Sequence, residues 1–247
     1  MHHLVLERWS RGASALHRRD ARAKILALLV LLIALATAGK GLPFLASSLL
    51  LLLVAGLRWA GIPVAGALAR AALVLPISAM FAAISWLDGD PGRGAVLATK
   101  SYLSALAVVL VVSTTPLPPL LRACGQLGAP RLLLEIGQFL FRYLFVISEE
   151  AQHMTKAAEA RGSPRRWAGR QRRFRAAAGA LAVLFAHSYV RAADIHRAML
   201  SRGFQGSLPL LEPRRFHRGD AVFVSVTIAL IVGLRIVAER VAPGYLG

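Results

Sequence analysis

The chain has 247 residues, 56% of them hydrophobic, and a net charge of +18 from 30 Lys and Arg against 12 Asp and Glu. Soluble domains average about 45–50% apolar residues, so a mean hydropathy of +0.57 indicates a membrane protein. Nucleic acid then comes last among the partners of a basic chain. A single cysteine, Cys124, excludes an internal disulfide and a metal site built from cysteines.

The first half of the chain consists of a basic segment followed by apolar runs. Residues 1–24 are polar and rich in arginine. Four apolar runs follow, at about 25–38, 43–57, 63–87 and 95–115. Because a transmembrane helix needs about 20 apolar residues, each run predicts a span, and the short first run is expected to tilt or to recruit its flanks. Pro76, inside the third run, is expected to kink that helix.

The second half contains two long helical patterns and a last apolar run. A short amphipathic piece is expected at 117–128, helices at about 131–161 and 174–202, and a final span at 221–238. The first pattern places one apolar face at three- and four-residue steps: Ile136, Leu140, Tyr143, Ile147, Ala151, Met154 and Ala158. The second carries a near-heptad seam suited to a partner helix: Phe174, Ala178, Leu181, Phe185, Ser188, Ala192, Ile195 and Met199.

Charge predicts the orientation in the membrane. Residues 150–218 hold fourteen Lys and Arg, so the positive-inside rule places them in the cytoplasm with the basic N-terminus. A span at 131–148 would move them outside, which argues against it, whereas Arg235 and Arg240 fit an outward C-terminus poorly. We therefore expect an all-α polytopic protein with about five spans and long cytoplasmic helices inserted before the last. Its expected regions are a cytoplasmic N-terminus (1–24), four membrane helices (25–116), a cytoplasmic helical region (117–218) and a last span (219–247).

Two similar tripeptides end the two long helical patterns. Ala160-Arg161-Gly162 closes the first, and Ser201-Arg202-Gly203 closes the second. A glycine after a helix commonly caps it, and a basic residue in the last turn complements the helix dipole, so each tripeptide alone predicts a capped end. The similarity of the two ends favours a binding role in addition to capping, because a small residue before each arginine leaves room for a partner surface. Such an arginine can form bidentate hydrogen bonds with a carboxylate or with carbonyl groups.

Motifs for catalysis or metal binding are missing from the sequence. Gly39-Lys40-Gly41 lacks the other residues of a phosphate-binding loop, and no Ser/His/Asp arrangement stands out, so we expect a chain that is not an enzyme. His187 and His196 are nine residues apart, on opposite sides of a helix, and predict no metal site. The basic run 165–175 is expected to lie on the anionic inner leaflet of the bilayer.

The chain resembles, over nearly its whole length, the transmembrane T component of energy-coupling-factor transporters. The two tripeptides match that family's signature motifs, here Glu159-Ala160-Arg161-Gly162 and Arg197-Ala198-Met199-Leu200-Ser201-Arg202-Gly203-Phe204. Ser201 departs from the commoner alanine but is also a small residue. The stretches 17–24, 142–145 and 149–151, together with Gly203-Phe204-Gln205-Gly206, look like the cobalt/nickel branch of the family.

The resemblance implies a non-catalytic subunit in the inner membrane of the cell. Its partners would be a dimer of cytoplasmic ABC ATPases, which bind the ATP, and a metal-binding membrane S component, so this chain would hold no cofactor or metal itself. Ala160, Arg161, Gly162, Ser201, Arg202 and Gly203 would couple it to the ATPases, with each arginine in a groove of one ATPase subunit. ATP-driven closure would then move the coupling helices and tilt or release the S component.

Two alternatives remain open from the sequence. The same architecture could serve a vitamin such as biotin rather than cobalt or nickel. In a different class, the chain could be a membrane anchor or scaffold whose basic insert binds lipid or an unrelated protein.

Overall fold

The computed structural model describes residues 12, 14, 16–39, 41–162, 170–206 and 217–241, and the secondary structure of these residues is helical throughout. They form two compact units, one of residues 1–127 and 214–247 and the other of residues 128–213. The expected all-α polytopic membrane fold is confirmed. Three parts of the sequence-based predictions lie outside the described residues. They are much of the N-terminus at 1–24, Lys40 in the turn after the first apolar run, and residues 163–169, which include the first part of the basic run.

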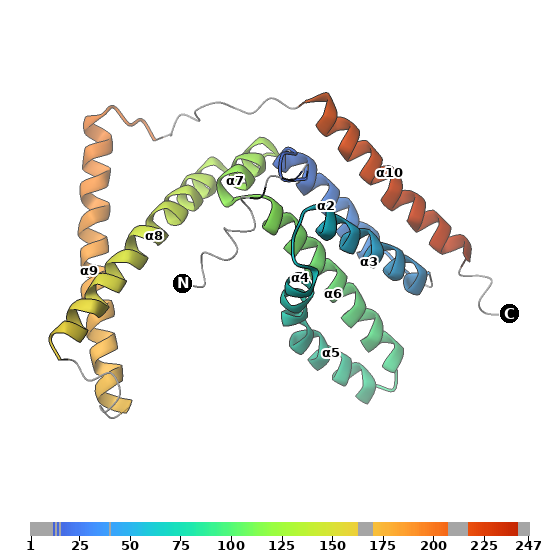
Figure 1. The fold of residues 1–247 in the computed structure, drawn as a ribbon, viewed down its shortest axis with the longest axis horizontal. Helices are drawn as coiled ribbons and strands as arrows, with labels where there is room; N and C mark the ends of the chain where they lie inside the picture. The colour runs from blue at the N-terminus through green and yellow to red at the C-terminus, as the bar shows by residue number, and fades with distance from the viewer. Residues whose placement is uncertain are drawn as a thin grey trace. The chain divides into compact units, whose positions relative to one another are not determined.

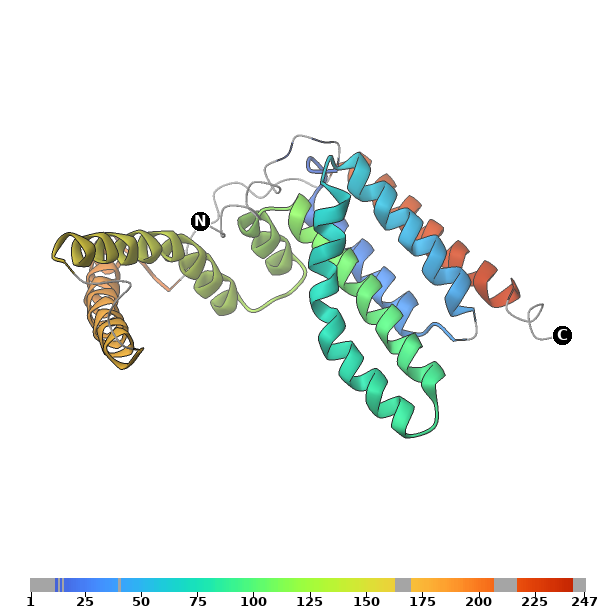
Figure 2. The same cartoon turned by 60° about the horizontal axis from the view of Figure 1, so that its bottom comes forward.

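The first unit contains most of the apolar helices (Figure 1). They are α2 (Ala21–Ala36), α3 (Leu42–Trp59), α4 (Val64–Ala71), the 3₁₀ turn η1 (Ala72–Val74), α5 (Leu75–Leu87), α6 (Pro91–Thr114), α7 (Leu117–Gln126) and α10 (Arg218–Val241). The break at η1 falls just before Pro76, as expected for a kinked third span. α5 and α6 form an antiparallel hairpin, and Figure 2 shows them side by side.

Among the described residues, five helical segments are long and apolar enough to cross a membrane. They are Leu42–Trp59, Val64–Leu87, Gly92–Thr114, Phe174–Ser201 and Arg218–Arg240. Four of them correspond to expected spans. The expected first span is absent from this set because α2 has only 16 residues. The set also includes the helix expected in the cytoplasm at 174–202. Its first half is apolar, because Arg175 is the single Lys, Arg, Asp or Glu between Phe174 and Val190.

The short helix α2 is held at its N-terminus by groups from two other helices. The Asp20 carboxylate caps the helix by accepting from the Arg22 N–H at 2.9 Å. Asp220 of α10 accepts from the Asp20 N–H at 3.2 Å and from the His217 N–H at 3.4 Å, so one carboxylate joins the first turns of α2 and α10. The buried Lys24 donates from Nζ to the Thr114 carbonyl at 2.8 Å, at the C-terminus of α6.

At the other end of α2, cations from α10 and α6 satisfy its last carbonyl groups. Arg235 of α10 donates to the Ala34 carbonyl at 2.8 Å and also to the Thr37 carbonyl. Lys100 of α6 donates to the carbonyls of Ala36, at 3.0 Å, and Ala38, at 2.8 Å. A helix of 16 residues is about 24 Å long, whereas the hydrocarbon layer is about 30 Å thick. The end of so short a helix would not reach the water on the far side of the bilayer. Lys100 and Arg235 therefore donate the hydrogen bonds that water would otherwise give to its last carbonyl groups.

The same contacts set the direction of three helices. Asp220 lies at the start of α2 and Arg235 at its end, so α2 and α10 run parallel. Lys24 meets the end of α6 and Lys100 meets the end of α2, so these two helices run antiparallel. Arg235, which fitted the sequence-based topology poorly, is thus a helix cap that also pairs with Glu239 at 2.9 Å.

The core of the first unit is a leucine stripe on α3. Five leucines at three- and four-residue steps are buried: Leu42, Leu45, Leu49, Leu53 and Leu57. They pack with buried residues of α2, α6 and α10, including Leu35, Leu106 and Ile231. The small residue Gly41 lets the start of α3 approach α10, because a Cβ there would collide with the backbone of Ala238.

This close approach gives a stability prediction. We expect Gly41→Ala to lower the free energy of unfolding by about 1–3 kcal/mol, the usual cost of overpacking. Gly39→Ala is the matched control, because a Cβ at Gly39 meets nothing within 4 Å. Thermal unfolding of both variants in mild detergent checks the difference, and equal melting temperatures would show that α3 and α10 do not pack this closely.

The second unit is built from two long helices, α8 (Arg131–Ala160) and α9 (Arg170–Ser201). Both correspond to helices expected from the sequence. No residue of α8 is buried, and the described side chains of α9 are exposed or half-buried. Because a helix pair without a buried core gains little from packing, this unit presents most of its apolar surface to something outside itself.

Candidate coupling site

The first Arg-Gly tripeptide forms a capped helix end. α8 ends at Ala160, and Arg161 occupies the C-cap position, with its N–H donating to the Ala157 carbonyl at 3.2 Å. Gly162 follows with φ +77°, a left-handed conformation that favours glycine. Its N–H donates to the Glu159 carbonyl at 3.0 Å. The backbone therefore turns away from the helix axis immediately after the arginine.

The second tripeptide repeats this geometry at the end of α9. Arg202 is again the first residue after the helix, and its N–H donates to the Met199 carbonyl at 3.1 Å. Gly203 has φ +80° and donates to the Leu200 carbonyl at 3.0 Å, while the Phe204 N–H donates to the Met199 carbonyl at 3.0 Å. These last two bonds make up a Schellman motif. The glycines are therefore caps, as their sequence pattern predicts.

The side chains of both tripeptides are open to a partner. Ala160, Arg161, Gly162, Ser201, Arg202 and Gly203 are all exposed. Within the described part of the chain, the guanidinium groups of Arg161 and Arg202 have no hydrogen bond or ion pair. The Ser201 hydroxyl donates back to the Ala198 carbonyl at 2.9 Å, so it does not compete for a ligand of Arg202. Each guanidinium can therefore offer its full set of donors to a carboxylate or to carbonyl groups.

The two tripeptides stand at different ends of the helix pair. Figure 1 shows that α8 ends near the beginning of α9. The C-terminal end of α9, where Arg202 follows, is therefore one helix length away from the end of α8. α9 has 32 residues, which corresponds to about 48 Å. Such spacing suits two separate contacts rather than one shared anion site.

The C-terminal half of the predicted seam on α9 packs against α8. A cavity of about 540 Å³ lies between the two helices. Its lining includes Ile136, Leu140, Tyr143 and Ile147 from the α8 stripe, and Ser188, Ala192, Ile195 and Met199 from the α9 seam. Phe204 also lines it, so the residue that closes the Schellman motif packs near Met199 and ties the second arginine end to the helix pair.

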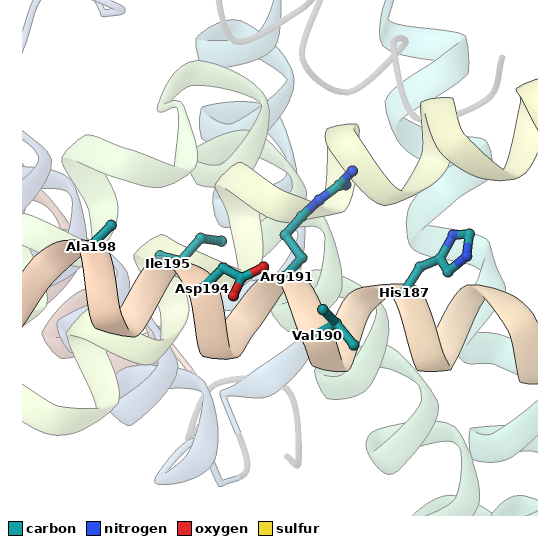
Figure 3. Close-up of a pocket in the computed structure, with 6 residues that line it drawn as sticks. All are labelled: His187, Val190, Arg191, Asp194, Ile195 and Ala198. Carbon is teal, nitrogen blue, oxygen red and sulfur yellow. The ribbon is translucent and has the colours of Figure 1, made fainter.

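A polar cluster fixes the same crossing. The carboxylate of Glu150 on α8 lies 3.8 Å from Nδ1 of His187 and 3.9 Å from a guanidinium nitrogen of Arg191. Figure 3 shows Arg191 reaching from α9 toward the neighbouring helix, beside Asp194. His187, Arg191 and Asp194 line a hollow of about 510 Å³ on α9. This cluster joins residues far apart in the sequence, and no spacing within one helix could have indicated it.

Among the residues that the structure describes, the N-terminal half of the seam has no such partner. Phe174, Leu181 and Phe185 are 74%, 65% and 74% exposed. The predicted seam is therefore half occupied by α8 and half open. An open apolar stretch of this kind marks a surface for another protein or for lipid.

The structure brings no metal site together in its described residues, where no group of three or more His, Cys, Asp or Glu could hold an ion. His187 is placed beside Glu150, and His153 lies 3.8 Å from Glu149. Each of these exposed histidines thus lies beside a single glutamate and not in a cluster of metal ligands.

Comparisons with known proteins agree with the helical plan. The family described as CbiQ, cobalt transport protein, matches residues 12–211. A cobalt transport protein CbiQ from Rhodobacter capsulatus is 29% identical over 161 residues, which are 63% of this chain and 64% of that protein. The chain therefore spans slightly less than two thirds of that relative.

Two further relatives align over more of their length. An energy-coupling factor transporter transmembrane protein EcfT from Acidaminococcus fermentans is 27% identical, covering 93% of this chain and 94% of that protein. An uncharacterized protein of Methanocaldococcus jannaschii is 24% identical, covering 96% and 87%. The match over most of the chain, on a helical membrane fold with two capped arginine ends, shows that the chain belongs to the CbiQ family, the cobalt branch of the T components of energy-coupling-factor transporters.

Proposed function

We propose that this chain couples cytoplasmic ABC ATPases to a metal-binding S component in an importer for cobalt or nickel. The observation that carries the proposal is the pair of exposed arginines, Arg161 and Arg202, held in similar capped ends on a unit whose described residues are all exposed or half-buried. A dimeric ATPase offers two equivalent grooves, and the two ends of the helix pair supply one arginine for each. ATP is bound by the ATPase subunits, and this chain takes the role of a non-catalytic subunit.

The coupling follows from how each arginine is held. Because the Schellman motif and Met199 fix the backbone around Arg202, a force on its guanidinium moves the whole of α9 instead of a flexible loop. α8 contacts α9 through Glu150, which lies beside His187 and Arg191, and through the apolar side chains around the cavity between the two helices. Closure of the ATPase dimer would thus change the angle between the two helices, and the open apolar half of α9 would transmit the change to the S component.

The parallel course of α2 and α10 supports the proposed orientation in the inner membrane. Both helices start on the same side, where Asp220 joins their first turns. The basic N-terminus and the arginines of the second unit precede these two starts in the sequence, so positive-inside topology places both starts at the cytoplasmic face. The second unit would then lie in the cytoplasm, with α9 as a surface helix despite its apolar first half.

The cargo is tested by uptake. The chain is co-expressed with its ATPases and with either a metal-type or a biotin-type S component, and cells are assayed with radiolabelled Co²⁺, Ni²⁺ and biotin. We expect ATP-dependent uptake of Co²⁺ or Ni²⁺ with the metal-type subunit and no uptake with biotin. Transport of biotin alone would contradict the metal assignment while leaving the coupling role intact.

A further inference from the structure

A groove of about 610 Å³ opens in the first unit between α2, α3, α6 and α10. Its walls are formed almost wholly by apolar side chains, among them Leu28, Leu52, Leu110, Val226 and Leu230. Among the described residues of its lining, the charged ones are two cations, Arg19 and Lys24.

The two cations lie at one end of the groove. Lys24 lies in the first turn of α2 and meets Thr114 in the last turn of α6, and Arg19 lies two residues before α2 begins. Along α10 the lining runs from Val222 to Ile231, nine residues or about 13.5 Å. This is close to half of the hydrocarbon thickness of about 30 Å. The groove therefore has the depth of one leaflet, with positive charge at the level of its headgroups.

The geometry points to a binding site for an anionic phospholipid, with an acyl chain in the groove and the phosphate at Arg19. Lys24 supplies charge, because its ammonium group is already bonded to the Thr114 carbonyl and to Oγ1 of Thr115 at 2.9 Å. Arg19 supplies donors, since it contacts Asp220 at a distance of 3.9 Å and its side chain is 38% exposed. At 3.9 Å the carboxylate of Asp220 lies beyond hydrogen-bonding distance of the guanidinium, so this contact uses none of its donors.

The lining of the groove favours a lipid over a helix from a partner. Arg19 also lies over the ring of Phe223, 5.8 Å from its centroid, which keeps the guanidinium at the mouth of the groove. A phosphate group complements the two cations at this end, which an apolar stretch of a partner helix would not do. The binding chemistry is independent of cargo and of ATPase coupling; only the assignment to the cytoplasmic leaflet depends on the proposed function.

Native mass spectrometry of the full-length protein in mild detergent tests the site. The protein is titrated with phosphatidylglycerol or with phosphatidylcholine of the same chains. We expect phosphatidylglycerol to be retained preferentially. Arg19→Gln should reduce this preference about fivefold, the effect of one cation at an anionic surface. Arg58→Gln, which removes a charge from the last turn of α3 outside the groove lining, should leave the preference unchanged.

Blocking the groove separates the acyl chain from the headgroup. Ala55 is exposed and lines the groove, so Ala55→Trp should remove bound lipid of both classes without disturbing the core. Val226→Trp, at a position 62% exposed, is an independent variant from α10. Leu51→Trp is the control, because Leu51 is 72% exposed and lies outside the lining. Equal retention of the two lipids by the unmodified protein, or undiminished binding in both blocked variants, would overturn the proposal.

Discussion

Replacing Arg161 and Arg202 together with alanine is expected to abolish ATPase docking and cargo uptake while the protein stays in the membrane. Removing one partner of a buried, hydrogen-bonded charge pair in an interface costs about 2–5 kcal/mol, at least thirtyfold in affinity. In the proposed assembly the two contacts hold one ATPase dimer, so losing both would remove the avidity that links them. Co-purification with the ATPases and uptake of radiolabelled Co²⁺ measure the two effects.

A matched double variant controls for charge. Lys156→Ala with Arg175→Ala removes two exposed cations from the same helices, outside both signature motifs, and should leave docking nearly intact. Arg161→Lys with Arg202→Lys keeps the charge but not the bidentate fork, and should give an intermediate loss. Full uptake by the double alanine variant would mean that the arginine ends do not couple the chain to ATPases.

Replacing Lys100 and Arg235 together with methionine is expected to cause a large loss of stability. Together they cap the carbonyls of Ala34, Ala36, Thr37 and Ala38 at the end of α2. A buried acceptor left unsatisfied costs about 1–3 kcal/mol, and two of these carbonyls, those of Ala34 and Ala38, belong to buried residues. The double variant should therefore lose about 2–6 kcal/mol, which lowers the melting temperature on the order of 10 °C.

Thermal unfolding in detergent or in nanodiscs measures this loss. Arg93→Met is the control on α6, because Arg93 is 81% exposed and pairs with Asp90 in the loop that precedes the helix. Its melting temperature should stay within about 2 °C of that of the unmodified protein, as for most surface substitutions. If the double methionine variant melts like this control, the cations do not hold the end of α2.

Helix positions were predictable because periodicity and breakers act locally. The patterns at 131–161 and 174–202 correspond to α8 and α9, and Gly162 and Gly203 adopt the left-handed cap that their position predicts. The expected kink near Pro76 appears as a 3₁₀ turn just before it. The length of α2 was harder to predict, because the helix starts earlier than its apolar run and is completed by cations from other helices.

Features that depend on distant residues were not predictable. Arg235 in an apolar run is costly in lipid, and only the fold shows that the C-terminus of α2 lies beside it. The link from Glu150 to His187 and Arg191 likewise needs the crossing of α8 and α9. The seam on α9 was predicted as one continuous face, yet α8 covers only its second half, because a steep crossing limits how far two helices stay in contact.

Site-specific photo-cross-linking tests the coupling claim most directly. A photoreactive phenylalanine analogue is placed at Ala160 or at Ser201, next to each arginine, and at Gly179, in the N-terminal half of α9, as control. In the assembled transporter we predict cross-links to an ATPase subunit from both arginine ends and none from Gly179. Absence of ATPase cross-links from Ala160 and from Ser201, in a complex that still transports its cargo, would contradict the account.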